Sequence, residues 1–227
     1  MMSSIEANFD RLALLDDEGW TANNHYHSLL LTYVPQNCEN AIEIGCGTGA
    51  FARQLGKRCT RVVGLDLSVQ MIRVARSRST QFNNVEFQVA DAMSWDFPQS
   101  HFDFVCSIAT LHHLDQRQLL LKIKDALKPR GVLVVLDLVR SNGLAERMVD
   151  VFGGGVSVSL RLIHNGRLKP PAEVRKAWEE HGKHDHYSTI PEMRALADEI
   201  LPGAEVRRHL LWRYSLVYQK PATDSHG

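Results

Sequence analysis

The sequence feature that most constrains the fold is a glycine-rich turn placed directly after a short apolar run. Residues 41–49 read Ala-Ile-Glu-Ile-Gly-Cys-Gly-Thr-Gly. Glycines at alternate positions leave three residues of the turn without a Cβ, so the backbone there can take positive φ angles and a ligand can approach it closely. The pattern predicts a buried strand over Ala41–Ile44 and a helix over Ala50–Lys57, whose first N–H groups point back at the turn. We therefore expect a small ligand with an anionic group at this turn.

Strand-like and helix-like segments alternate downstream of the turn. Further strands are expected over residues 61–66, 85–90, 102–108, 132–138, 205–211 and 214–219, and further helices over residues 69–77, 116–127 and 190–201. This alternation predicts a doubly wound α/β fold. Only Trp212-Arg213 separates the last two strands, and so short a link joins antiparallel strands. We expect a mostly parallel seven-stranded sheet with an antiparallel last strand, in a single domain over residues 1–227.

Two segments fall outside the alternation. Residues 1–39 are expected to form an N-terminal helical cap, in which Thr21 caps a helix that stops at Pro35. Residues 140–188 contain several glycines and a proline pair, and they favour two or three short helical stretches without a strand. We expect this second segment to be a helical insertion packed over the sheet edge rather than a separate domain.

The overall charge is balanced, with 26 Lys plus Arg against 26 Asp plus Glu. A chain without a general basic field is poorly suited to hold nucleic acid. The first residues lack the basic and apolar regions of a signal peptide, and the longest apolar run, Gly131–Val139, is too short to span a membrane. The four cysteines form no Cys-x-x-Cys pair and are expected to be reduced thiols. Together these features predict a cytoplasmic protein that binds neither nucleic acid nor membrane.

Two kinds of ligand fit the glycine-rich turn. Residues 45–50 match a loose dinucleotide fingerprint, and Asp66 lies about where a ribose-binding acid would lie. Glu43, however, would repel a pyrophosphate and would attract a cationic ligand such as S-adenosylmethionine, which carries a sulfonium and an ammonium. An acidic and a small residue at positions 91–92 follow the third strand, where an adenine edge could be read. The pattern favours S-adenosylmethionine, with a nicotinamide-dependent oxidoreductase as the alternative.

Five motifs in order resemble those of class I S-adenosylmethionine-dependent methyltransferases. They are Glu-Ile-Gly-Cys-Gly-Thr-Gly, Gly-Leu-Asp-Leu-Ser-Val-Gln-Met-Ile, Ala-Asp-Ala, Phe-Asp-Phe-Val-Cys-Ser-Ile-Ala-Thr-Leu-His-His-Leu and Leu-Lys-Pro-Arg-Gly-Val-Leu. The resemblance covers residues 41–139 and is to the small-molecule, type 11-like members. Residues 140–188 lie outside the shared motifs, in a region that shapes the acceptor pocket of such enzymes.

The resemblance implies that S-adenosyl-L-methionine is the cofactor. It places around the cofactor a set of residues at the ends of the first four strands: Glu43, Gly45, Cys46, Gly47, Gly49, Asp66, Leu67, Met71, Asp91, Ala92, Ser107 and Ile108. Among these, Glu43 would face the ammonium group, Asp66 would accept both ribose hydroxyls, and Asp91 would meet the adenine edge. The glycines would line the methionyl part.

The acceptor is expected to be a small molecule methylated at oxygen or nitrogen. Residues 107–110 read Ser-Ile-Ala-Thr. In the nucleic-acid and protein-amide methyltransferases of the family that this chain resembles, the same region often reads Asn/Asp-Pro-Pro-Tyr/Phe. Methylation of a quinone-type or other carbon, and a cofactor-binding subunit without activity, are the alternatives within the family. The oligomeric state has no signature in the sequence.

Histidines supply the candidates for a general base, because imidazole exchanges protons near neutral pH. His112, just after the fourth strand, is the catalytic candidate; the alternative is that His112 and His113 only cap a loop and pack. Residues 25–27 of the lead-in helix are further candidates, or form an ordinary amphipathic face. The cluster at residues 181–186 lacks the spacing of a metal site, so no metal is expected.

Overall fold

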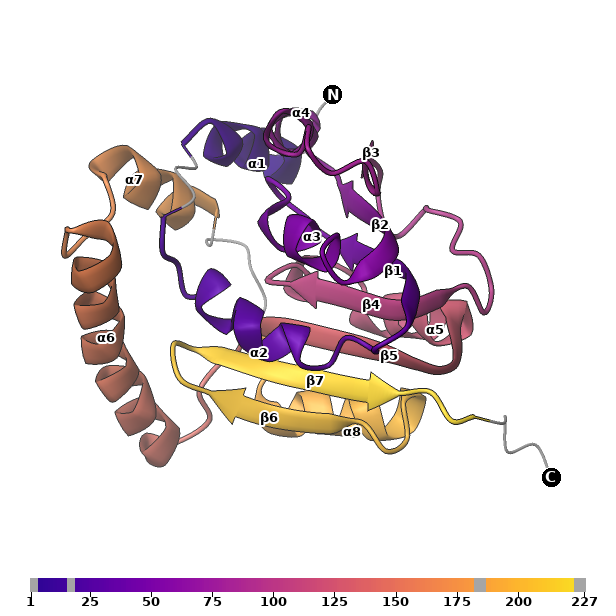
Figure 1. The fold of residues 1–227 in the computed structure, drawn as a ribbon. Helices are drawn as coiled ribbons and strands as arrows, with labels where there is room; N and C mark the ends of the chain where they lie inside the picture. The colour runs from indigo at the N-terminus through magenta and orange to yellow at the C-terminus, as the bar shows by residue number, and fades with distance from the viewer. Residues whose placement is uncertain (1–3, 16–18, 182–186, 223–227) are drawn as a thin grey trace.

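The computed structural model describes residues 4–15, 19–181 and 187–222. Its centre is a seven-stranded sheet in the order β3-β2-β1-β4-β5-β7-β6 (Figure 1). The strands are β1 (Cys38–Ile44), β2 (Cys59–Asp66), β3 (Val85–Val89), β4 (Phe102–Ile108), β5 (Leu127–Leu138), β6 (Glu205–His209) and β7 (Arg213–Gln219). β7 runs antiparallel to both β5 and β6, and the other pairs are parallel. The predicted fold class is confirmed.

Helices cover both faces of the sheet (Figure 1). They are α1 (Ser4–Leu15), η1 (Asn24–Tyr26), α2 (His27–Leu31), α3 (Ala50–Leu55), α4 (Val69–Arg78), η2 (Leu111–His113), α5 (Gln116–Ala126), α6 (Leu144–Asn165), α7 (Ala172–His181) and α8 (Ile190–Ile200). One apolar core packs α5 and α8 against the sheet, and a second packs α2, α3 and α4 against its other face. β5 is buried on both faces over residues 131–137, where its sequence is apolar apart from Asp137.

The predicted caps organise several of these helices. Asp115 Oδ1 accepts a hydrogen bond from Gln118 N at 3.0 Å and starts α5. Thr189 and Glu192 form a capping box at the start of α8. Thr21 Oγ1 accepts from Asn24 N at 3.2 Å, but the N-cap of the first helical turn, the 3₁₀ helix η1, is Asn23, not the predicted Thr21.

Several predicted boundaries differ from the structure, and two of these differences change how elements connect. α5 ends at Ala126, and β5 begins at once at Leu127, where a helical continuation was expected. Leu127 is extended because its side chain is fully buried against the sheet. The last hairpin turns at residues 210–212 rather than 212–213, with Leu211 and Trp212 at positive φ, because Arg213 is already paired in the sheet.

The segment 140–188 is also different from expectation. Its first helix, α6, is continuous over 22 residues, where two or three short helical stretches were expected in the whole segment. A Cβ on Gly153 would lie 3.3 Å from Leu211 N, and one on Gly154 would lie 3.8 Å from the Trp212 ring. Gly153 therefore allows α6 to pack closely on the β6–β7 turn, whereas a Cβ on Gly154 would make only an ordinary contact, and the helix continues through both. Among the described residues, none of the helices is both long and apolar enough to cross a membrane.

Candidate functional site

The glycine-rich turn after β1 is shaped by close contacts. Gly45, Gly47 and Gly49 all have positive φ, at 72°, 51° and 79°. A Cβ on Gly45 would fall 2.0 Å from Thr110 Oγ1, and one on Gly49 would fall 2.7 Å from the Phe87 ring. A Cβ on Gly47, in contrast, would make only an ordinary contact, with Met71 Sδ at 3.9 Å. Two of the glycines thus serve packing, and the third leaves the backbone open to a ligand.

A first cavity of about 290 Å³ lies beside this turn, at the carboxyl ends of β1, β2 and β4. Ligands of doubly wound sheets bind at this end of the strands. Most of the predicted cofactor residues line the cavity: Glu43, Gly45, Cys46, Gly47, Asp66, Leu67, Met71, Asp91, Ala92 and Ile108. Gly49 and Ser107 are not among its lining residues. The predicted cofactor set lacked several others that line it, including Phe9 and Thr110, and His27 and His113, which were named only as candidate bases, line it too.

Glu43 is a buried carboxylate on the wall of the first cavity. Its side chain is 3% exposed, and Oε2 has no hydrogen-bond partner among the described residues. Burial raises the pKa of Glu43 well above its usual value, and a hydrogen bond from the Ala52 backbone opposes that rise in part. A buried, unsatisfied carboxylate is costly unless a ligand supplies donors or positive charge.

Two further aspartates stand at strand ends on the same cavity. Asp66 Oδ2 accepts from Gly47 N at 2.9 Å, and Oδ1 accepts from Ser68 N at 2.9 Å. Burial raises the pKa of Asp66, and these backbone N–H groups counteract it. Each carboxylate oxygen has a second lone pair for a ligand hydroxyl. Asp91 Oδ1 accepts from Met93 N at 2.8 Å, which fixes this side chain at the rim.

Helix α1 closes the cavity from the side of the N-terminal segment. Asp10 Oδ1 accepts from Ser68 Oγ at 2.5 Å and from Gln70 N at 3.2 Å, at the first turn of α4. One residue earlier, the Phe9 ring packs edge-to-face on His113, with centroids 5.6 Å apart. Charge on Asp10 also suits the positive end of α4. This contact was not predicted from the sequence, because it joins two helices far apart in the chain.

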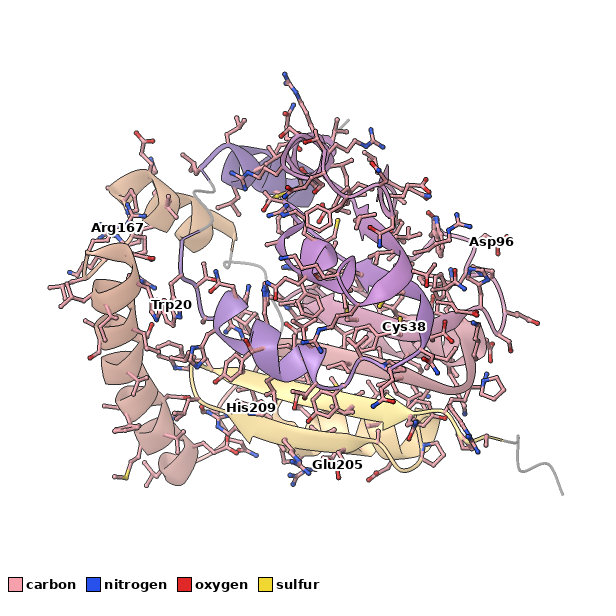
Figure 2. The ribbon with its side chains drawn as sticks, viewed as in Figure 1. Trp20, Cys38, Asp96, Arg167, Glu205 and His209 are labelled. Atoms are coloured by element: carbon pink, nitrogen blue, oxygen red, sulfur yellow. The ribbon has the colours of Figure 1, made fainter. Side chains whose placement is uncertain are left out.

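A second cavity of about 500 Å³ adjoins the first and shares Phe9, Met71 and His113 with it. Residues 19–24, η2 and the segment around the α6–α7 connection form its other walls. Figure 2 shows Trp20 between α6 and the body of the molecule, with Arg167 at the α7 end of α6. Residues 1–39 and 140–188 thus both contribute to this cavity.

His112 lines the second cavity and is held by a buried aspartate. Its Nδ1 lies 2.6 Å from Asp137 Oδ1, and its backbone N–H donates to Asp137 Oδ2 at 2.8 Å. Asp137 is 0% exposed. It was missed by sequence reasoning, although the sequence holds a signal: an aspartate interrupts the otherwise apolar run of β5.

The second cavity has a cationic lining. Arg161, Arg167 and Arg213 contribute to it, and no Asp or Glu of the described residues does. Arg213 is 8% exposed and is held in place by Asn23, whose Oδ1 accepts from Nε at 2.9 Å and from Nη2 at 2.7 Å. Burial lowers the pKa of Arg213, and the charge of Asp137 opposes this.

The remaining histidine candidates have other surroundings. His25 packs on Trp20 and Tyr26 and lines neither cavity. His27 lines both cavities, but its Nδ1 lies 2.9 Å from Gln54 Nε2, and burial lowers its pKa to about 4. Much of the histidine cluster, residues 182–186, lies outside the described residues. Within the described part of the chain, no group of His, Cys, Asp or Glu is arranged to hold a metal ion.

Comparison with known proteins agrees with this geometry. Residues 42–135 match the family described as a methyltransferase domain. The chain is 31% identical to the uncharacterized methyltransferase Rv0089 of Mycobacterium tuberculosis over 213 residues. This alignment covers 90% of this chain and 99% of that protein. The chain belongs to the class I S-adenosylmethionine-dependent methyltransferases. S-adenosyl-L-methionine is its cofactor, and the nicotinamide alternative is set aside.

Two other similarities concern parts of the molecule or its fold. A 110-residue stretch is 40% identical to O-methyltransferase cnsE of Penicillium expansum, covering 46% of this chain and 40% of that protein. The fold is similar to that of phosphoethanolamine N-methyltransferase 2 of Haemonchus contortus in complex with S-adenosyl-L-methionine. The TM-score is 0.69, with 17% identity over 97% of this chain and 60% of that one.

The residues of the first cavity fit this methyltransferase's cofactor. The unpartnered Oε2 of Glu43 matches an ammonium group, which carries only donors. The open backbone at Gly47 leaves room for close approach, and the carboxylate of Asp66 offers acceptors for hydroxyls.

Proposed function

We propose that this methyltransferase methylates a hydroxyl oxygen of a small molecule that carries an acidic group, with His112 as general base. The observation that carries the proposal is the contact between His112 Nδ1 and Asp137 Oδ1 in the second cavity. An ionised carboxylate can only accept, so it favours the imidazole tautomer with the proton on Nδ1 and the lone pair on Nε2. Such a lone pair is what a base needs.

The need for a base separates the possible acceptors. A hydroxyl oxygen becomes a good nucleophile when its proton is removed, whereas an amine attacks in its neutral form. When bound, S-adenosylmethionine supplies an electrophilic methyl group on its sulfonium. The protein then has to align the acceptor, take its proton and exclude water. A buried His–Asp pair supports a hydroxyl acceptor, and the name of the relative from Penicillium expansum, an O-methyltransferase, agrees with it.

The cofactor would occupy the first cavity. In this proposal Glu43 holds the ammonium group, Asp66 the ribose hydroxyls and Asp91 the adenine edge, while Leu67 and Met71 pack on the adenine ring. All five residues line that cavity. The adjoining second cavity would then receive the acceptor, with the N-terminal cap of residues 1–39 and the insertion of residues 140–188 as two of its walls.

The charge of the second cavity indicates the kind of acceptor. Guanidinium groups of Arg161 and Arg213 line it together with several histidines, and no carboxylate of the described residues does. An acceptor with a carboxylate or phosphate group would gain charge-assisted hydrogen bonds there. Trp20 and Tyr187 also line this cavity and can pack on a planar ring.

The experiment compares methyl transfer to paired phenols that differ only in charge, such as hydroxybenzoates and hydroxybenzamides, with the product site identified by mass spectrometry and NMR. We expect O-methylation, with higher kcat/KM for the acids. His112→Asn should lower kcat about 10²- to 10⁴-fold, the usual contribution of a general base. His101→Asn, at an exposed position before β4, is the matched control and should leave kcat unchanged.

Three outcomes would contradict the proposal. If all products are methylated at nitrogen or carbon, the acceptor atom is not a hydroxyl oxygen. If the His112→Asn variant has an unchanged kcat, His112 is not the general base. Tight binding of S-adenosylmethionine without transfer to any of a broad acceptor set would favour a cofactor-binding subunit without activity of its own.

A further inference from the structure

Helix α6 turns its apolar side toward solvent. The side chains of Met148, Val151 and Ile163 are 74%, 78% and 74% exposed, and they recur at the spacing of one helix face. The same face carries Leu144, Phe152, Val158 and Leu162, all of them exposed. A surface helix normally directs such a face into the core. Here α6 stands at the periphery of the molecule, beside the turn between β6 and β7 (Figure 1).

Specific contacts on the opposite face fix this orientation. Arg208 Nη2 donates to Asp150 Oδ1 at 2.6 Å near the start of α6. At its end, Asn165 Oδ1 accepts from Trp20 N at 2.8 Å, and Asn165 Nδ2 donates to Trp20 O at 3.0 Å. Between them, Gly153 is buried against Leu211. Rotating α6 about its axis to bury its apolar side would break these contacts, so they hold the apolar side toward solvent.

We propose that this face is an interface with a second copy of the chain, in which two α6 helices pack antiparallel about a twofold axis at Gly155. A twofold interface must be complementary to itself. Gly155 lies at the middle of α6, on the exposed face, and a Cβ placed there would meet nothing within 4 Å. Antiparallel packing about Gly155 sets Met148 opposite Leu162 of the second copy and Phe152 opposite its Val158, so apolar residues meet apolar residues.

The size and charge of the face support a second copy as its occupant. Its large apolar side chains together expose several hundred square ångströms, which approaches the roughly 800 Å² that each partner buries in a standard interface. Between Leu144 and Ile163 the charged residues of α6 are Glu146, Arg147, Asp150 and Arg161, and of these only Arg147 is exposed. An anionic lipid surface would instead require a row of basic residues beside the apolar face.

Small residues at the centre explain how two helices could approach. Gly155 and Ser159 are exposed neighbours on this face, one turn apart. Without bulky side chains at the crossing point, the helix backbones can come close, and the larger residues on either side can then interdigitate.

The test uses the full-length protein in sedimentation equilibrium over a range of concentrations. We expect a species of twice the 25.6 kDa chain mass at micromolar concentrations. Val151→Glu should shift the protein to the monomer, because the exchange places two carboxylates in an apolar interface. Leu121→Glu, on an exposed apolar position of α5, is the control and should remain dimeric.

A second variant makes the result independent of how well Val151→Glu folds. All four native cysteines are buried, so Gly155→Cys introduces an accessible thiol at the proposed axis. Mild oxidation should link it to a covalent dimer within minutes, whereas Ser77→Cys on exposed α4 should not cross-link. A wild-type protein that stays monomeric at 100 µM, or equal cross-linking of the two cysteine variants, would overturn the proposal. So would a monomer that co-floats with anionic phospholipid vesicles, which would assign the face to a membrane surface.

Discussion

His112 Nδ1 and Asp137 Oδ1 lie 2.6 Å apart, although 25 positions separate the two residues in the sequence. The contact exists because β4 and β5 are neighbouring parallel strands, and both residues stand at their carboxyl ends. Ala109 begins the loop after β4 at φ 51°, an unusual conformation for a residue with a side chain, and its N–H donates to Leu136 O at 2.7 Å. The chain is thereby turned so that His112 reaches Asp137.

The Asp137→Asn variant should show whether Asp137 acts by positioning His112 or by supporting cofactor binding. The amide can donate to Nδ1, which favours the wrong imidazole tautomer while it conserves shape. We expect kcat to fall about 10²- to 10⁴-fold, with little change in the affinity for S-adenosylhomocysteine. Steady-state kinetics and calorimetric titration check the two parts. If kcat is unchanged while only thermal stability falls, Asp137 is a structural residue.

Asp66→Ala should weaken cofactor binding. The ribose hydroxyls lose a charged acceptor, which is worth roughly 1–3 kcal/mol in binding free energy. Calorimetric titration with S-adenosylhomocysteine measures the loss, and Asp96→Ala, on an exposed loop, is the control. Unchanged affinity in Asp66→Ala would mean that the ribose is held elsewhere.

Glu43→Gln should have opposite effects on binding and on stability. The variant keeps the size of the side chain but removes its charge, so S-adenosylhomocysteine should bind more weakly. The ligand-free protein should become more stable, because the native state no longer buries a carboxylate whose Oε2 has no partner among the described residues. Since the pKa of Glu43 is raised in the folded state, this advantage should be absent below the usual value of 4.5 and should grow as pH rises above it. Thermal unfolding of both proteins across this range tests the sign; an advantage that shrinks with rising pH would contradict it.

His27 should make stability depend on pH in the acid range. Burial lowers its pKa from 6.5 to about 4, so between these pH values His27 is protonated in the unfolded state but neutral in the folded state. Its contribution to the free energy of unfolding is complete above pH 6.5 and is lost as pH falls toward 4, by up to about 3 kcal/mol. Urea unfolding of wild type and His27→Gln at several pH values isolates this residue. A difference between the two proteins that is constant from pH 7 to pH 4 would refute the prediction.

The sequence predicted the sheet and the grouping of the motif residues at one edge of it, because both follow from local patterns. Strand–helix alternation fixes the carboxyl ends of β1, β2 and β4 at one edge, so motif residues such as Glu43, Asp66 and Ile108 converge on one cavity. The exceptions, Gly49 and Ser107, occupy motif positions too, but a pattern cannot tell whether a residue faces the ligand or the core behind it.

Features that depend on contacts between distant segments were missed. The contact of Asp10 in α1 with Gln70 at the start of α4, and that of Asp137 with His112, are not encoded in any local pattern. The continuity of α6 was missed for a related reason: its glycines look like helix breakers until the β6–β7 turn is seen packed against Gly153. In each case a tertiary contact overrides the local preference.

The structure of the complex with S-adenosylhomocysteine tests the central claim most directly, because it requires no knowledge of the acceptor. We predict that the amino group of the ligand lies about 3 Å from Glu43 Oε2, that the ribose hydroxyls bond to Asp66, and that the thioether sulfur faces the second cavity on the side of His112. A ligand bound outside the first cavity, or one whose sulfur is walled off from His112, would contradict the account.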